Sequence, residues 1–83
     1  MAEMGVKAIE ELLIREVASI LSIDPPTVTI DTPFHSLGMS SLAFVELLVV
    51  IEEALDLKLM ETDLRREDFQ TVGSLALRIS RMV

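Results

Sequence analysis

The chain has 83 residues, of which 51% are apolar and 25% are charged, a composition that allows one small compact domain, residues 1–83, and no second one. Seven Lys and Arg against fourteen Asp and Glu give a net charge of −7. This charge excludes sequence-independent binding to nucleic acid phosphates, because such binding needs clustered cations. With no Cys, the chain has neither a disulfide framework nor a thiolate metal site, and packing alone must hold it together.

The sequence predicts a cytoplasmic protein. Residues 1–11 contain three Glu and no basic region that leads into an apolar stretch, so they do not resemble a secretory signal. The longest apolar stretch, residues 42–59, is interrupted by five charged residues and falls short of the ~20 apolar residues that a membrane span needs. We therefore expect no membrane span, and because the sequence starts at its own Met1 we expect a free-standing protein.

A first amphipathic helix is predicted from Lys7 to Ser22. Apolar residues recur there at helical spacing, namely Ile9, Leu13, Val17 and Ile20. The helix must end before Pro25, because proline removes a backbone donor and pushes the preceding residue out of helical geometry. A loop follows to about Ser40, and a loop of this length is usually functional or well packed. Four residues provide it with apolar anchors: Val28, Ile30, Phe34 and Leu37.

The second helix is predicted from the Ser40, Ser41 pair to about Leu55. Serine oxygens accept hydrogen bonds from the free N–H groups of a first helical turn, so this pair is a good start signal. At about 100° per residue, one broad face of the helix is apolar and is expected to face the core. That face holds Phe44, Leu47, Leu48, Ile51 and Leu55.

The opposite face of this helix is acidic and carries an apolar stripe. The acids are Glu46, Glu52, Glu53 and Asp56, and the stripe among them is Leu42, Val45 and Val49. An apolar stripe surrounded by acids is typical of a docking surface for a protein partner. Alternatively, a small bundle can bury such residues or expose them singly. Residues 41–63 hold one basic and six acidic residues, so this element would steer a positively charged partner.

The C-terminal part predicts a further short turn and a last helix. A linker from Lys58 to Asp63 leads into a polar patch, Leu64 to Phe69, that can form one short helical turn. Thr71 is a good N-cap for the last helix, which presents two unlike sides. Its apolar side holds Val72, Leu75, Ala76, Ile79 and Met82, and its polar side Ser74, Arg78 and Arg81. The predicted fold is therefore an all-α, small four-helix bundle: three main helices plus one short helix, with a long loop between helices one and two.

The run Leu37, Gly38, Met39, Ser40, Ser41, Leu42 resembles the attachment motif of acyl carrier proteins. In that family a serine directly before a leucine bears a 4′-phosphopantetheine arm. The resemblance extends into the loop, the second helix and the last helix. It includes Ile30, Asp31, Thr32, Phe34, Val45, Glu46, Leu47, Glu52, Glu53, Asp68, Phe69, Thr71, Val72 and Leu75.

The resemblance implies a non-catalytic carrier whose arm is attached covalently to Ser41. The arm would hold an acyl group as a thioester and present it to enzymes of fatty acid, polyketide or related lipid biosynthesis. The implied partners are a phosphopantetheinyl transferase and acyl-loading, condensing and acyltransferase enzymes, acting on a monomer. Ser40 and Ala43 stand where carriers of fatty acid synthesis often have acids, which favours a specialised carrier over the housekeeping one.

The physical position of Ser41 agrees with that role. A hydroxyl at a helix N-terminus is exposed, and a phosphodiester placed there meets unsatisfied N–H groups and the positive end of the helix dipole. Gly38 relieves steric limits where the loop turns into the helix and lets an enzyme approach the backbone.

Several alternatives stay open. The chain could be an aminoacyl or peptidyl carrier, or a carrier-like interaction module that is never modified. The two serines could be N-capping residues and nothing more. An enzyme built on Ser41, His35 and Asp31 would need an enclosed pocket with oxyanion donors, which so small a bundle can hardly supply. One His and scattered carboxylates show no ligand spacing, so no metal site is expected.

Overall fold

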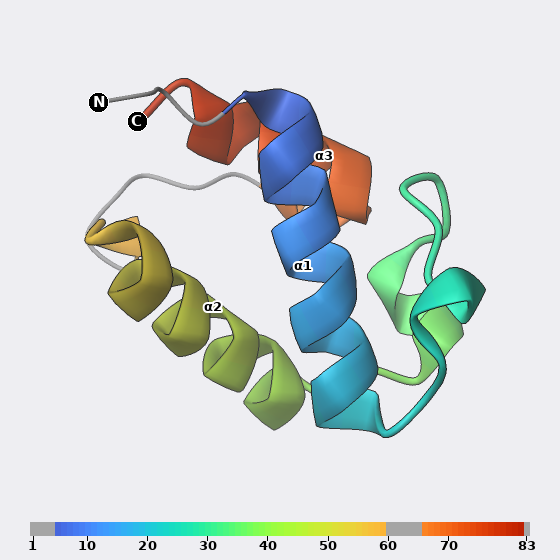
Figure 1. Cartoon of the computed structure of the whole chain (residues 1–83). Helices are drawn as coiled ribbons and strands as arrows, with labels where there is room; N and C mark the ends of the chain where they lie inside the picture. Colours follow the sequence, from blue (N-terminus) through green and yellow to red (C-terminus); the bar gives the residue numbers. More distant parts are fainter. Residues whose placement is uncertain (1–4, 60–65, 83) are drawn as a thin grey trace.

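The computed structural model describes residues 5–59 and 66–82. Three α-helices carry the fold: α1 (Val6–Leu21), α2 (Ser41–Leu55) and α3 (Val72–Ser80). Short 3-10 turns also lie between them, and those described in full are η1 (Pro25–Thr27), η2 (Phe34–Leu37) and η4 (Arg66–Phe69). Figure 1 shows α1 crossing in front of α3, with α2 on one side of α1 and the loop that carries η1 and η2 on the other. The predicted all-α class is confirmed, and over the described ranges there is no strand, only an isolated bridge between Pro33 and Thr71.

α1 and α2 begin and end within one residue of the predicted positions, whereas α3 ends at Ser80, two residues before Met82, the last residue predicted to lie on its apolar side. α1 covers Val6–Leu21 instead of Lys7 to Ser22, because Ser22 adopts the left-handed conformation, with φ 58° and ψ 45°. The Ile23 N–H then donates to the Ala18 carbonyl at 3.0 Å, which satisfies one of the free carbonyl groups at the helix end. α1 is therefore closed by its own C-cap before the chain reaches the prolines.

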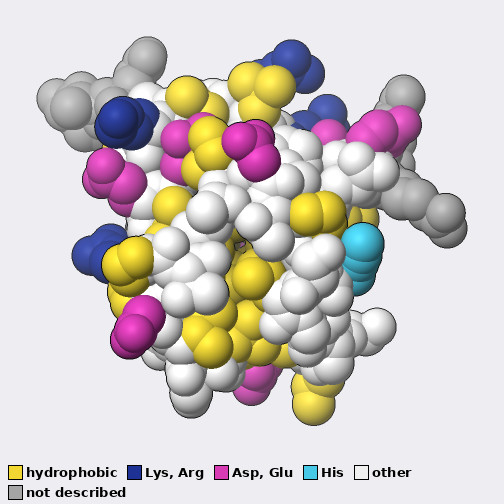
Figure 2. Space-filling view, turned by 90° about the vertical axis from the view of Figure 1, so that its right-hand side faces the viewer, with side chains coloured by type: hydrophobic (Ala, Val, Ile, Leu, Met, Phe, Trp, Pro, Cys, Tyr) yellow, Lys and Arg dark blue, Asp and Glu magenta, His cyan; other side chains and the backbone are white. Residues whose placement is uncertain are grey.

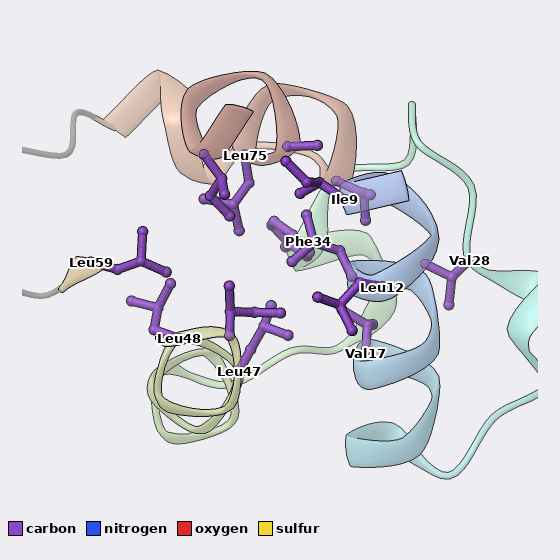
Figure 3. Close-up of a cluster of buried hydrophobic side chains, with 14 of the residues drawn as sticks. Ile9, Leu12, Val17, Val28, Phe34, Leu47, Leu48, Leu59 and Leu75 are labelled. Atoms are coloured by element: carbon purple, nitrogen blue, oxygen red, sulfur yellow. The ribbon is translucent and has the colours of Figure 1, made fainter. Parts of the chain in front are cut away.

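The long loop before α2 packs onto the helices through three of its four predicted anchors, Val28, Phe34 and Leu37. Val28 and Phe34 are 3% and 5% exposed, and Figure 3 shows Phe34 among side chains from all three α-helices. Leu37 is half-buried. The Ile30 side chain is 37% exposed, so its predicted role as an apolar anchor is wrong. Ile30 holds the loop through its backbone instead, because its carbonyl accepts a hydrogen bond of 3.0 Å from the Gly73 N–H at the start of α3.

The core lies where the three α-helices meet, and the predicted inward faces provide most of it. Nine of the side chains that are less than 2% exposed are large: Ile9, Leu13, Val17, Leu47, Ile51, Leu59, Val72, Leu75 and Ile79. Leu59 belongs to the segment that the sequence assigns to a linker, yet it is fully buried. Four further residues from the predicted apolar sides of the helices are half-buried and pack against this core: Ile20, Phe44, Leu55 and Met82. The predicted short helix near Phe69 is the 3-10 turn Arg66–Phe69, and residues 60–65 of that connection lie outside the described residues.

Figure 2 shows the side of the molecule that carries the loop. Hydrophobic side chains gather at a hollow in the middle of this face, and charged side chains lie around its edges. Among the residues that the structure describes, no helix has the length and apolar character to cross a membrane.

The start of α3 provides a test of local capping. The Ser74 N–H donates to Thr71 Oγ1 at 3.0 Å, and the Thr71 N–H donates to Ser74 Oγ at 3.1 Å, which completes a capping box. Thr71→Ala should lower the free energy of unfolding by about 1 kcal/mol, because the Ser74 N–H loses its acceptor, Thr71 Oγ1. Urea denaturation measures the change, and Thr27→Ala, an exposed threonine in η1, should change it by less than about 0.5 kcal/mol. Equal effects of the two substitutions would show that the capping box does not stabilise α3.

Candidate functional site

Ser41 is the first residue of α2, and its side chain is exposed. The N-cap is the preceding residue, Ser40, whose Oγ accepts a hydrogen bond of 3.1 Å from the Ala43 N–H. The Phe44 N–H donates to the Ser40 carbonyl at 2.9 Å, as the first intrahelical bond. The two serines therefore have separate roles: Ser40 caps the helix, and the hydroxyl of Ser41 is presented to solvent.

Gly38 sets the direction from which the chain enters α2. It ends η2 with φ 78° and ψ 24°, a left-handed conformation that a side chain makes unfavourable, and its N–H donates to the His35 carbonyl at 3.2 Å. A Cβ atom placed on Gly38 would have nothing within 4 Å. The glycine is thus needed for its backbone conformation and not because a side chain would meet a neighbouring atom.

A cavity of about 410 Å³ opens beside Ser41. Its wall comes from η2, the start of α2 and η4, and consists of Phe34, His35, Met39, Ser40, Ser41, Phe44, Val45, Leu48 and Phe69. The three phenylalanines pack edge to face in a row, with ring centroids 5.4 Å apart for Phe34 and Phe44 and 5.0 Å apart for Phe44 and Phe69. Phe44 is only half-buried because it lies in this cavity wall rather than at the centre of the core.

The predicted apolar stripe on α2 points outward. Leu42 is 74% exposed, Val45 44% and Val49 40%, whereas Leu48 is 7% exposed and faces the core. Of the predicted acidic positions, Glu46, Glu53 and Asp56 are exposed and Glu52 is half-buried. The helical wheel thus predicted correctly that Leu42, Val45 and Val49 face outward while Leu48 faces the core.

The structure does not assemble the residues of the alternative catalytic arrangement around one cavity. His35 and Ser41 both line the cavity beside α2, but Asp31 is an exposed loop residue and is not part of its wall. Within residues 5–59 and 66–82, no three His, Asp or Glu side chains are grouped in a way that could hold a metal ion.

Sequence reasoning missed the cavity beside Ser41. Phe69 was placed only by resemblance to the family, and Met39 was not given a role of its own. The available signal was the edge position of Phe44 on the apolar face of α2, since an edge residue is the one that a neighbouring element can leave partly uncovered.

A phosphate-linked group fits this site. By helix geometry, the N–H groups of residues 41 and 42 have no acceptor within α2, and they carry the positive end of the helix dipole. A phosphate on Ser41 would lie next to them, and the cavity would offer an apolar surface to whatever follows the phosphate. The fold and the site therefore define a small helical protein suited to carrying a covalently attached prosthetic arm.

A comparison with protein families agrees with this description. The family described as "Phosphopantetheine attachment site" matches residues 11–79, which include α2, the cavity wall and almost all of α3. The chain belongs to this phosphopantetheine attachment family, and it is a non-catalytic, phosphopantetheine-bearing carrier protein. A comparison with solved structures found no match.

Proposed function

We propose that Ser41 is the residue that bears the 4′-phosphopantetheine arm and that the protein is an acyl carrier. The observation that carries the first part is the exposed hydroxyl of Ser41 at the N-terminus of α2, inside the matched region. A phosphopantetheinyl transferase would move the arm from coenzyme A to this hydroxyl: the Ser41 oxygen forms a phosphodiester bond, the pyrophosphate bond of coenzyme A breaks, and adenosine 3′,5′-bisphosphate and the hydroxyl proton leave. Acyl-loading, condensing and acyltransferase enzymes of fatty acid, polyketide or related lipid biosynthesis would then act on the thioester.

The wall of the cavity beside Ser41 supports an acyl cargo over an aminoacyl or peptidyl cargo. Six of its nine lining residues are aromatic or aliphatic or carry a thioether, and none is an acid or a Lys or Arg. An aliphatic chain gains free energy by leaving water for such a surface. An aminoacyl group would bring a charged ammonium, which is costly to bury without a partner.

A matched pair of cargoes tests the proposal. A broad phosphopantetheinyl transferase is given the full chain together with coenzyme A, hexanoyl-coenzyme A or leucyl-coenzyme A, and intact mass and peptide mapping report the modified residue. The hexanoyl and leucyl groups have equal numbers of carbons and differ by the ammonium and the branching. We expect modification at Ser41 only, and a higher Tm for the hexanoyl form than for the form with the free arm, because a chain bound only by the folded state stabilises it.

The outcomes separate the two parts of the proposal. A mass gain on another residue would overturn the assignment of Ser41. No mass gain at all would make the chain an unmodified member of its family. A rise in Tm for the leucyl form but not for the hexanoyl form would replace the acyl carrier by an aminoacyl carrier.

The acidic positions of α2 are expected to speed the encounter with basic partner enzymes. Reversing Glu46 and Glu53 together to Lys should lower kcat/KM for arm transfer about 10-fold at low salt, because exposed charges act mainly on association rates. The dependence of the rate on salt should become weaker. The matched control is the double reversal of Glu11 and Asp24, two exposed acids away from α2 that change the net charge equally. Equal values of kcat/KM for the two double variants would show that only net charge matters and would contradict docking through α2.

A further inference from the structure

A second depression borders the acidic face of α2, and α1 forms its other wall. It measures about 490 Å³ and is lined by Ile20 from α1 and by Val45, Glu46, Val49 and Val50 from α2. Figure 1 shows the C-terminal end of α1 beside the N-terminal half of α2, where these residues lie. The sequence places Ile20 on the apolar side of α1; its side chain is half-buried against the core, and its open part belongs to this groove.

The chemistry of the groove defines what would fill it. Four of the five lining residues are aliphatic, so an apolar side chain would gain most by entering. The fifth, Glu46, is an acid, and covering its carboxylate without a cation would be costly. On α1, the half-buried Glu16 lies four residues before Ile20 and therefore on the same helix face. The chemistry of the groove therefore fits an apolar side chain with a Lys or Arg next to it. A protein surface can present this combination, whereas an anionic lipid brings negative charge.

The groove is also connected to the attachment site. Val45 lines both the groove and the cavity beside Ser41. It lies four residues after Ser41, about one helical turn along α2. Enzymes that act on the far end of the arm can dock at a distance, but the enzyme that attaches the arm must bring its reacting groups to the Ser41 hydroxyl. Among the partners of a carrier, the transferase is the one that must cover this part of α2.

We propose that the groove between the C-terminal end of α1 and the outer face of α2 is a docking site for the phosphopantetheinyl transferase, with Ile20 as its α1 wall. The transferase inserts an apolar side chain between Ile20 and the valines of α2, and a neighbouring Lys or Arg pairs with Glu46. This inference rests on the proposed attachment at Ser41. It makes α1, and not α2 alone, part of the recognition surface.

The chain offers a matched control for Ile20. Ile14 has the same residue type on the same helix and is also half-buried against the core, but it lines a different depression with Ala8, Glu11 and Arg15. The experiment measures kcat and KM for arm transfer to the full apo chain by a broad transferase with coenzyme A. The variants are Ile20→Lys and Ile14→Lys, both checked by circular dichroism melting. Lys can keep its aliphatic stem on the core edge and its charge in water, so both changes are suited to partly exposed positions.

Ile20→Lys should raise KM about 10-fold or more with little change in kcat, because the groove loses its apolar wall and gains a charge that repels the cation of the transferase. Ile14→Lys should stay within about 2-fold of wild type. If Ile20→Lys does not fold, Ile20→Ala and Ile14→Ala give the same comparison, with KM expected to rise only for Ile20→Ala. Ile20→Leu, which keeps an apolar wall, should load within about 2-fold of wild type, whereas Ile20→Ala, which removes the wall without adding a charge, should still raise KM; a merely electrostatic effect of Lys would leave Ile20→Ala at the wild-type KM.

Each contrary result has a distinct meaning. Wild-type protein that gains no arm overturns the proposed function and the groove assignment with it. Wild-type protein that is loaded normally, with equal KM for the Ile20 and Ile14 variants, overturns the groove alone. Light scattering could instead show that the wild-type protein is a dimer and that Ile20→Lys is a monomer with unchanged loading. The groove would then be a contact between two copies of this chain, and the proposal would be overturned.

Discussion

Ser41→Ala is expected to abolish loading of the phosphopantetheine arm while the protein stays folded. The Ser41 oxygen is the proposed bond-forming atom, so no arm can be attached without it. The cap of α2 belongs to Ser40, whose Oγ accepts from the Ala43 N–H at 3.1 Å, and Ser41 contributes an exposed side chain to the fold. Intact mass after incubation with a broad transferase and coenzyme A measures the loss. The melting temperature should remain close to that of the wild type.

Ser40→Ala is the matched control for this prediction. It removes the neighbouring hydroxyl, so it should cost about 1 kcal/mol of stability through the lost N-cap and still be loaded. The two serines should thus show opposite patterns: one affects loading without stability, the other stability without loading. An arm retained in Ser41→Ala, or found on Ser40, would contradict the assignment.

Leu48→Ala and Val49→Ala are expected to differ strongly, although the two residues are adjacent in α2. Leu48 is 7% exposed within the core cluster, and truncating a buried leucine to alanine typically costs ~2 to 5 kcal/mol. A domain of this size has a total stability of only about 5 to 10 kcal/mol, so Leu48→Ala should melt at a much lower temperature or fail to fold. Val49 is 40% exposed, and its replacement by alanine removes a β-branched residue from a helix, which favours the helix slightly. Val49→Ala should therefore melt close to the wild type.

The rate of arm transfer should be lowered by Val49→Ala even though this variant stays folded. Val49 lines the groove between α1 and α2, so Val49→Ala should slow arm transfer by the proposed transferase contact while the protein stays folded. Thermal melting and steady-state loading on the same two samples separate stability from docking. If Val49→Ala proves as destabilising as Leu48→Ala, the apolar stripe of α2 belongs to the core and the docking surface is wrong.

Val45 lines both the cavity beside Ser41 and the groove between α1 and α2. A partner that presses on the groove contacts the same side chain that lines the cavity beside the arm. Docking and the proposed binding of cargo therefore meet at one residue, with only one helical turn of α2 between the groove and the attachment point.

The local features of this protein could be predicted from its sequence, because each depends on residues that are close together in the chain. Apolar periodicity located α1, α2 and α3 and the inward positions Leu47, Leu48 and Ile51. Thr71 was predicted as an N-cap from its own chemistry and is one. The Ser40, Ser41 pair marked the start of α2 for the same reason. The outward direction of Leu42, Val45 and Val49 followed from the wheel alone, because unpaired acids on the same arc cannot be buried cheaply.

Only the tertiary structure decided how completely each apolar position is covered. A helical wheel gives the direction of a side chain about its own axis, but the depth of its burial depends on where the neighbouring helix crosses and what the loop places against it. For this reason Ile20, on the apolar side of α1, and Phe44, predicted to face the core, became walls of a groove and a cavity, and the predicted linker residue Leu59 became fully buried. Ile30, a predicted anchor, is exposed and holds the loop through its carbonyl, because a backbone hydrogen bond to Gly73 leaves no pattern in the sequence. The sequence thus determined the helices and the position of Ser41 at the start of α2. The packing of η2 and η4 against α2 decided what lines the cavity beside Ser41, and the packing of α1 against α2 formed the groove.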